Sequence, residues 1–146
     1  MKWQVFCIGK PSLDYAKRGI DEYSKRLRRY SGLDIRESRE AGSEKNSRYL
    51  LDSSQGAIRI AMDERGKHLS TREFAGLVER WQIEGTRKVA FLVGGAEGHT
   101  EELRKEADQV WALSKLTLQH ELALVVLLEQ IYRVHTLLKG EPYHRD

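Results

Sequence analysis

The chain has 146 residues, of which 40% are hydrophobic and 32% are charged, proportions typical of a globular protein that buries a core. No apolar run approaches the roughly 20 residues of a membrane span, and the strand-like start is too short for a signal peptide. The sequence therefore predicts one cytoplasmic domain over residues 1–146. A single cysteine, Cys7, argues against a disulfide framework or a cysteine-rich zinc site. None of the five histidines has a partner at metal-site spacing, so no metal is expected.

The net charge is only +3, but basic residues cluster between positions 16 and 30. Against two acids, Asp21 and Glu22, this segment carries Lys17, Arg18, Lys25, Arg26, Arg28 and Arg29. Such a cluster can follow a phosphate backbone. The plainer interpretation is a solvated helix face, and only a cofactor site elsewhere in the chain would favour the first.

The first third of the chain predicts two strands and two helices. Residues Lys2–Ile8 form the first strand, and apolar residues on both of its sides indicate an inner strand of a covered sheet. Trp3, Val5 and Cys7 lie on one side, Phe6 and Ile8 on the other. Residues 16–30 have apolar and aromatic side chains at helical spacing, which leaves the basic residues outside. Residues 33–39 predict an edge strand, and a polar loop over 40–47 leads into a short helix over 47–55.

A third strand is predicted over residues 57–62, and the charged segment 63–66 reads as the turn that ends it. Ser70 and Glu73 have the spacing of a capping box, which predicts the start of an amphipathic helix. Gly85 is the expected end of that helix.

The last third begins with Lys88–Val93, the most strand-like run in the chain. Thr100 is a candidate N-cap for a helix that extends to about residue 109. Residues 110–113 predict a short final strand, and residues 121–138 predict the last helix. Strands that alternate with helices indicate an α/β fold with a parallel sheet of about five strands, covered by helices on both faces.

The last predicted helix is apolar nearly all round over its first half. Its apolar residues are Leu122, Leu124, Val125, Val126, Leu127, Leu128, Ile131, Val134, Leu137 and Leu138. Such a helix must be buried on more than one side. One face of a sheet cannot cover it in so small a chain, and symmetric dimers are the commonest oligomers. A homodimer is therefore expected.

A glycine-rich segment, Gly94-Gly95-Ala96-Glu97-Gly98, follows a strand and precedes a helix. This position suits a nucleotide-type ligand at the carboxyl end of a strand. The spacing is neither G-x-G-x-x-G after a first strand nor a P-loop, so a simple tight turn is the alternative. No serine lies in a nucleophile elbow, and Cys7 is expected to be a packing residue, so covalent catalysis is not expected.

Two polar segments flank the last helix. His120 stands where a loop turns into that helix, where it either braces the loop or serves the site. Tyr143, His144 and Arg145 would ordinarily form a frayed tail. They follow a buried helix directly, however, and aromatic, imidazole and guanidinium groups can stack on a base and bind phosphate.

Four segments together carry a resemblance that none carries alone. They are Gly94-Gly95-x-x-Gly98, Leu113-Ser-Lys-Leu-Thr-Leu-x-His120, Glu129-Gln-Ile-Tyr-Arg133 and Pro142-Tyr-His-Arg145, with Met62-Asp63-x-x-Gly66-Lys67 in support. The chain closely resembles, over its whole length, the ribosomal large-subunit pseudouridine N3-methyltransferases. That family belongs to the SPOUT superfamily of knotted methyltransferases.

The resemblance implies an α/β knot, in which the C-terminal segment is threaded through a loop as a deep trefoil. It implies S-adenosylmethionine as cofactor. The cofactor-binding residues would be Met62, Gly94, Ser114, Lys115, Leu116, Thr117, Leu118 and Gln119. It further implies a homodimer whose methyl acceptor is N3 of a pseudouridine in 23S rRNA of the assembled ribosome. The catalytic side would be completed by Tyr143, His144 and Arg145 of the opposite subunit.

Two positions depart from the family pattern. Gln119 stands where proline commonly precedes the loop histidine, and Leu124 stands where an arginine often follows it. The first relaxes a backbone constraint, and the second removes a cation from the last helix. The alternatives to the rRNA methyltransferase are a knotted methyltransferase for another RNA, such as tRNA, and a catalytically silent RNA-binding or ribosome assembly protein.

Overall fold

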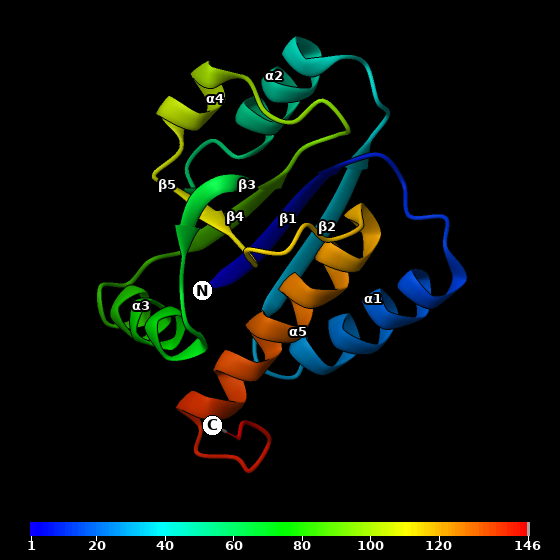
Figure 1. Cartoon of the computed structure of the whole chain (residues 1–146). Coiled ribbons are helices and arrows are strands. Elements are labelled where there is room, and N and C mark those ends of the chain that lie inside the picture. The colour runs from blue at the N-terminus through cyan, green and yellow to red at the C-terminus, as the bar shows by residue number, and fades with distance from the viewer. Residues whose placement is uncertain (146) are drawn as a thin grey trace.

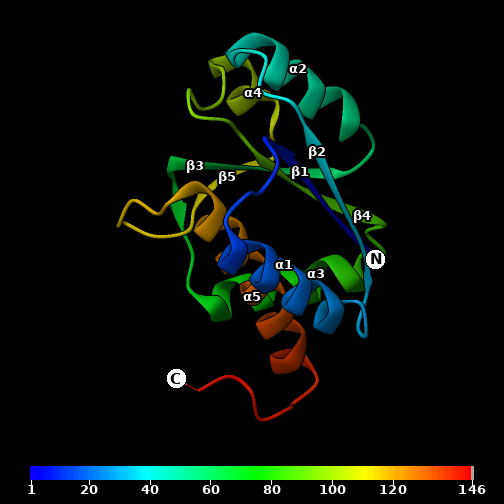
Figure 2. The same ribbon diagram turned by 90° about the vertical axis from the view of Figure 1, so that its right-hand side faces the viewer.

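The computed structural model describes residues 1–145, which form a five-stranded parallel sheet with helices on both faces (Figures 1 and 2). In chain order the elements are β1 (Lys2–Ile8), α1 (Asp14–Leu27), β2 (Gly32–Ser38), α2 (Ser43–Ser53), β3 (Ile58–His68), α3 (Thr71–Ile83), β4 (Lys88–Val93), α4 (Glu101–Glu106), β5 (Gln109–Ala112) and α5 (His120–Leu138). The strand order is β2-β1-β4-β3-β5, and all neighbouring strands are parallel. Helices α1, α3 and α5 cover one face, and α2 and α4 cover the other (Figure 2). The predicted parallel, doubly covered sheet is confirmed.

The inner strands bury side chains on both faces, as the sequence of β1 predicts. Trp3, Val5 and Cys7 join the core under α1, α3 and α5. Phe6 and Ile8 join the second core, under α2 and α4. β1 lies between β2 and β4, and β2 is the edge strand that residues 33–39 predict. Each face of the sheet therefore has its own apolar layer, which fixes the register of these strands.

Trp3 is the centre of the larger core. Its ring is fully buried and lies 5.9 Å from Phe91 and 6.2 Å from Phe74, between ring centroids. Its indole Nε1–H donates to Nε2 of His135 in α5 at 2.9 Å. A buried indole N–H needs such a partner. His135 is therefore a structural residue that ties the last helix to the first strand.

The predicted helix caps of α3 and α4 are present. Ser70 and Glu73 form a complete capping box at the start of α3, and Gly85 follows that helix with a φ of +75°. The Thr100 side chain accepts from the Leu103 amide at the start of α4. These local signals are correct because each satisfies orphan backbone amides or carbonyls of a helix end.

Several expected boundaries are wrong. α2 begins at Ser43, directly after Gly42, rather than at residue 47. α1 ends at Leu27 and α4 at Glu106, three residues before the expected ends. At α2 and α4 the polar residues near the end carry no periodic apolar signal, whereas at α1 the aromatic Tyr30 continues the apolar spacing three residues beyond the helix.

The largest error concerns the segment 63–66, which is not a terminal turn. β3 continues to His68, and both Met62 and Lys67 pair with Trp111 of β5. The four residues between them bulge out of the strand. Gly66 makes this possible: a Cβ there would lie 2.6 Å from the Val110 carbonyl carbon and oxygen. Backbone contact this close excludes any side chain.

α5 is covered from three directions. Its buried side, including Leu128 and Ile131, packs on the sheet, and α1 and α3 flank it. A Cβ at Gly19 of α1 would lie 2.9 Å from Val125 Cγ1, so α1 and α5 approach closely because position 19 has no side chain. A half-buried strip that includes Leu122 and Val126 remains. The sheet, α1 and α3 together therefore cover more of α5 than the sheet alone would cover. This strip is the apolar part of α5 that they leave partly exposed.

Candidate functional site

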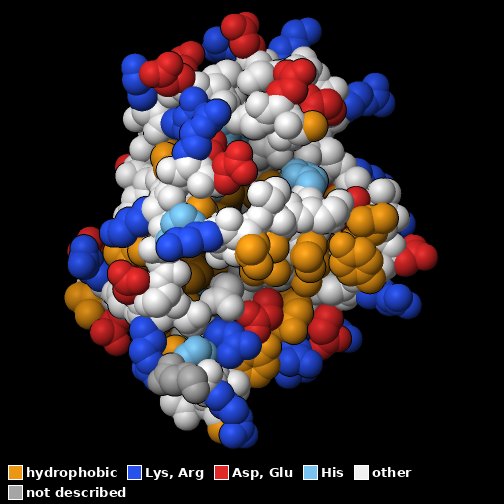
Figure 3. Space-filling view, in the orientation of Figure 1, with side chains coloured by type: hydrophobic (Ala, Val, Ile, Leu, Met, Phe, Trp, Pro, Cys, Tyr) orange, Lys and Arg blue, Asp and Glu red, His pale blue; other side chains and the backbone are white. Residues whose placement is uncertain are grey.

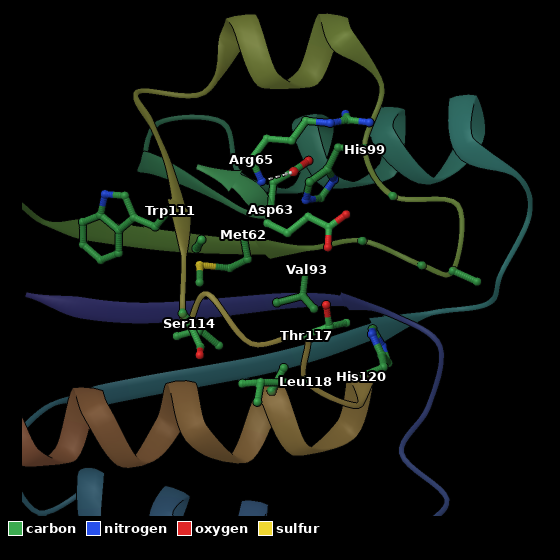
Figure 4. A pocket seen from close by; sticks show the side chains of 18 of the residues that line it. Met62, Asp63, Arg65, Val93, His99, Trp111, Ser114, Thr117, Leu118 and His120 are labelled. Carbon is green, nitrogen blue, oxygen red and sulfur yellow. Dashed lines mark hydrogen bonds between the residues drawn. The ribbon is translucent and has the colours of Figure 1, made fainter. Parts of the chain in front are cut away.

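A cavity of about 570 Å³ opens at the carboxyl ends of β3, β4 and β5 (Figure 4). Its walls are the bulge of β3, the loop 94–99 after β4, the loop 113–118 after β5 and the first turn of α5. Parallel strands bring the loops that follow them to the same edge of a sheet, where ligands of α/β proteins bind. The volume is in the range of small-molecule sites.

The loop after β4 presents main chain to the cavity. Gly98 has a φ of +75°, and its amide donates to the Gly95 carbonyl at 3.0 Å, which closes a tight turn. A Cβ at Gly94 would lie 3.1 Å from two ring atoms of His99. Glycine is therefore needed at 98 for its conformation and at 94 for space. The glycine-rich run is both a tight turn and a wall of the cavity.

His99 supports this turn from the protein side. It is 6% exposed, and its Nε2–H donates to the Leu92 carbonyl at 3.0 Å. Burial lowers the pKa of His99 below its ordinary value, so the ring is neutral at pH 7. The His99 carbonyl accepts from Arg104 of α4 at 2.7 Å. Both ends of the glycine turn are thereby held.

Charged groups reach the cavity from the bulge of β3 and from α4 (Figure 4). The Asp63 side chain is only 8% exposed, and its Oδ2 lies 3.5 Å from a guanidinium nitrogen of Arg104. Its Oδ1 accepts from the Arg65 amide at 2.9 Å. These contacts fix the Asp63 carboxylate at the wall, where its remaining lone pairs can accept hydrogen bonds from a ligand.

Most of the residues expected to hold the cofactor lie around this cavity. Those in its lining are Met62, Gly94, Ser114, Leu116, Thr117 and Leu118. Lys115 is exposed and lies outside the lining, as does Gln119. Within the loop, the Ser114 hydroxyl accepts from the Leu116 amide at 2.9 Å, while the Leu116 side chain is 77% exposed. This places a flexible apolar side chain at the mouth of the cavity.

Gln119 has a structural role instead. Its Oε1 accepts from the amides of Glu121 and Leu122 at 2.9 and 3.0 Å, which caps α5. The Tyr15 hydroxyl donates to the same oxygen at 3.3 Å. The residue at the usual proline position thus holds the loop by hydrogen bonds rather than by a fixed φ. The second departure, Leu124, is a buried core residue.

His120 begins α5 and lines the cavity with an exposed side chain. The neighbouring Glu121 accepts from the amides of Ser12 and Leu13 at 2.7 and 2.9 Å. This ties the loop after β1 to the start of α5. Bracing of the loop falls to Glu121 and Gln119, which leaves His120 facing the cavity.

The tail lies at the other end of α5 (Figure 1). The Tyr143 hydroxyl donates to Glu129 Oε2 at 2.8 Å, and the Arg133 guanidinium lies 4.7 Å from the centre of the Tyr143 ring. His144 Nδ1 accepts from Arg133 at 3.2 Å. Burial, then hydrogen bonds with Tyr23 and Glu129, raise the pKa of Tyr143 above its ordinary value, so the phenol stays protonated. The tail residues through His144 are therefore docked rather than frayed.

The docked tail is far from the cavity of its own chain. α5 has 19 residues, which at 1.5 Å per residue makes it about 28 Å long. The cavity lies at its first turn, whereas the tail folds back from its last turn only as far as Glu129 and Arg133, in the middle of the helix. Within one chain, the two predicted halves of the site therefore do not come together.

The basic cluster of α1 lies on its outer side. Arg26 pairs with Glu22 at 2.6 Å and also lies 5.5 Å from the centre of the Tyr132 ring. The other cations of the cluster are exposed: Lys17, Arg18, Lys25, Arg28 and Arg29. Both interpretations of the cluster remain open, although Arg26 has a packing role.

Three further features of residues 1–145, the part of the chain that the structure describes, bear on the chemistry of the site. Cys7 is 1% exposed, and burial raises the pKa of its thiol to about 12, which confirms it as a packing residue. Within this described range, no group of three His, Cys, Asp or Glu side chains could hold a metal ion. The same residues contain no helix with the length and hydropathy needed to cross a membrane.

Sequence reasoning missed three residues of the site: Asp63, His99 and Arg104. Their importance depends on contacts between the bulge, the glycine turn and α4, which no local pattern reports. The one available signal was the resemblance around Met62-Asp63-x-x-Gly66-Lys67, where the glycine and the acid are linked by the bulge.

Comparison with known proteins agrees with this geometry. Residues 1–144 match the family model described as "Predicted SPOUT methyltransferase". The protein named Ribosomal RNA large subunit methyltransferase H of Thermus thermophilus is 50% identical over 145 residues, which cover 99% of each chain. Proteins of the same name from Geobacter sulfurreducens and Deinococcus radiodurans are 40% and 38% identical, again with 99% of each chain covered. The chain therefore belongs to the SPOUT methyltransferase family.

Proposed function

We propose that the protein is a single-domain enzyme that methylates N3 of a pseudouridine in 23S rRNA of the assembled ribosome, with S-adenosylmethionine as methyl donor. One observation carries the proposal. A cavity walled by main chain opens at the carboxyl ends of three parallel strands, in a chain of the SPOUT methyltransferase family. Full-length similarity to proteins named as large-subunit rRNA methyltransferases supports the substrate. An enzyme that acts on ribosomes works in the cytoplasm.

The residues around the cavity fit this cofactor. Gly94 leaves room beside His99 that a Cβ would fill, so a flat base can approach the backbone of the turn. Val93 and Leu118 add apolar lining for the adenine ring. The Asp63 carboxylate suits a ribose hydroxyl or a cationic group. When bound, S-adenosylmethionine supplies a methyl group activated by its sulfonium.

The chain's own residues supply placement and charge. N3 of the acceptor base must lose its proton, and a cation close to the base stabilises the negative charge that develops. Arg145 can provide this cation. His144, whose Nδ1 accepts from Arg133, can donate a hydrogen bond to the base through its Nε2–H, and Tyr143 can stack on the base. Within its own chain this tail is docked by Glu129 and Arg133. Because the tail is already held in place, its side chains lose less rotational freedom when the substrate binds.

The proposal includes a homodimer, because the tail of one chain docks on Glu129 and Arg133 and does not line the cavity at the first turn of α5. On the face shown in Figure 3, hydrophobic side chains form a band over the first half of α5 and the adjoining part of α1. Exposed or half-buried apolar residues of this region include Leu13, Tyr15, Leu122 and Val126. A second copy packed on this band would bring its tail toward the first cavity. The proposal also includes the trefoil knot of the superfamily, formed where the loop 113–119 leads the chain from β5 into α5.

The test is methyl transfer with several RNA substrates in parallel. The purified protein is incubated with methyl-labelled S-adenosylmethionine and 70S ribosomes, 50S subunits, naked 23S rRNA or tRNA. Digestion and mass spectrometry of the nucleosides identify the product. We expect N3-methylpseudouridine at one position of 23S rRNA, formed fastest on 70S ribosomes. Methylated tRNA would indicate a different substrate, and cofactor binding without transfer to any RNA would indicate a silent RNA-binding protein.

A further inference from the structure

The loop between β2 and α2 contacts the glycine turn of the cavity. A Cβ at Gly95 would overlap a carboxylate oxygen of Glu40 and would lie 3.1 Å from Ile8 Cγ2. Gly95 has no positive φ, so its backbone conformation does not itself require glycine. What requires glycine at 95 is the acid that lies directly against its Cα.

Glu40 is held in this position by several donors. Its Oε2 accepts from Asn46 Nδ2 at 2.6 Å and from the Gly42 amide at 3.0 Å. Asn46 is itself 3% exposed, and its Oδ1 accepts from the Ala41 amide at 3.0 Å. The pKa of Glu40 lies below its ordinary value because of hydrogen bonds from Asn46, then from Gly42, and to a lesser degree from the backbone of Ala96. The carboxylate is therefore charged, fixed at one end by α2, and in contact with the glycine turn at the other.

A second tie joins the same helix to the far end of the loop. The Ser47 hydroxyl, which is 3% exposed, accepts from the Thr100 amide at 3.1 Å. Thr100 caps α4 immediately after the loop. The loop before α2 and the helix itself thus hold the loop 94–100 at both ends, through Glu40 at Gly95 and Ala96 and through Ser47 at Thr100.

We propose that Glu40 is a positioning residue that holds the backbone of Gly95 and Ala96 in the orientation that binds the cofactor. This inference rests on the proposed function of the cavity. Glu40 does not line the cavity and acts through the turn. Without the Glu40 carboxylate the turn would sample other conformations. The apparent affinity for the cofactor would then fall in proportion to the fraction of molecules whose turn keeps the binding conformation.

The experiment compares Glu40→Gln with a matched control, Glu44→Gln. Glu44 is an exposed acid in the first turn of α2, so both variants lose one negative charge at the same helix end. Titration calorimetry with S-adenosylhomocysteine gives the cofactor affinity of each. We expect Glu40→Gln to raise the Kd about fivefold or more and the control to stay within about twofold. In methyl transfer, Glu40→Gln should raise KM for the cofactor and leave kcat at saturating cofactor within about twofold.

A double-mutant cycle tests the contact itself. Gly95→Ala should displace the Glu40 carboxylate and raise the Kd by a similar factor. In a Glu40→Ala background the same substitution meets no carboxylate, only Ile8 Cγ2 at 3.1 Å, and should have a smaller effect than in the wild type. Additive effects of the two substitutions would contradict a shared contact.

Amide hydrogen exchange decides the role of Glu40 independently of ligand. Exchange over residues 94–98 should be faster in Glu40→Gln than in the wild type or in Glu44→Gln. Unchanged exchange, or a Kd of Glu40→Gln within twofold of wild type, would overturn the inference. Wild-type protein that binds no S-adenosylhomocysteine would instead refute the proposed function, while the exchange data would still report on Glu40.

Discussion

Gly66→Ala tests the most unusual backbone contact in the fold. The added Cβ would lie 2.6 Å from the carbonyl carbon and oxygen of Val110 and 2.7 Å from the carbonyl carbon of Trp111. These are backbone atoms of β5, so no rotamer change can relieve the overlap. Either the bulge 63–66 or the end of β5 must shift, at a cost of the order of overpacking in a core, about 2–3 kcal/mol. Because the bulge carries Asp63, cofactor affinity should fall as well.

Gly76→Ala is the matched control, with an effect of opposite sign. Gly76 lies inside α3, and a Cβ there meets no atom within 4 Å. Alanine is favoured over glycine in a helix by about 0.5–1 kcal/mol. Urea unfolding followed by tryptophan fluorescence should therefore give a lower midpoint for Gly66→Ala and a higher one for Gly76→Ala, with similar m-values. A Gly66→Ala protein as stable as the wild type would refute the close packing of β3 on β5.

Four further outcomes are expected. A chain that ends at Pro142 should bind S-adenosylhomocysteine with a Kd within about threefold of that of the full chain, because the tail is remote from the cavity. In single turnovers it should methylate ribosomes about a hundredfold more slowly than the full chain. Equal rates would make the tail dispensable. Gly94→Val should abolish cofactor binding in calorimetry without unfolding the protein, and an unchanged Kd would remove this glycine from the site. Val126→Asp, on the half-buried strip of α5, should give a folded monomer by light scattering, whereas a wild-type protein that is already monomeric would exclude the dimer. Burial lowers the pKa of His135 to about 4, whereas the pKa of a histidine in the unfolded chain is about 6.5. As the pH falls, the unfolded state therefore binds the proton first. The free energy of unfolding should decrease between pH 6.5 and 4, by up to about 3 kcal/mol. His135→Gln, which keeps an acceptor for Trp3, should show a shallower fall in urea midpoints over this range; equal slopes would contradict the assignment.

Much of the fold was predictable because it depends on local patterns. β1 and β4 have the bounds that their apolar runs predict, Lys2–Ile8 and Lys88–Val93, and a strand buried on both faces leaves a strong signal. The bulge of β3 was not predictable from the same reasoning. Its charged residues read as a turn, and its existence depends on how β5, more than 40 residues later, pairs with β3.

The candidate site also has parts that the sequence predicts and parts that it does not. The glycine run at Gly94 is identifiable from its position after a strand, and the residues of the loop 114–118 are identifiable from the family resemblance. His99 directly follows the glycine turn, but its bond to the Leu92 carbonyl is not visible in the sequence. Glu40 acts on the turn from a loop that the sequence places in no particular relation to it. The tail was expected to be functional, but its docking by Glu129 and Arg133, remote from the cavity of the same chain, required the length and direction of α5.

The bond between Trp3 and His135 joins residues 132 positions apart, and this has a consequence for synthesis. α5 supplies Leu124, Leu128 and Ile131 to the layer around Trp3, so this core between α1, α3 and the sheet stays incomplete until the end of the chain has been made. Domains fold as units when their last element emerges, and contacts distant in sequence form slowly. The nascent chain therefore leaves the ribosome with its aromatic centre open. We expect a chain stopped before α5 to expose this aromatic centre and therefore to aggregate.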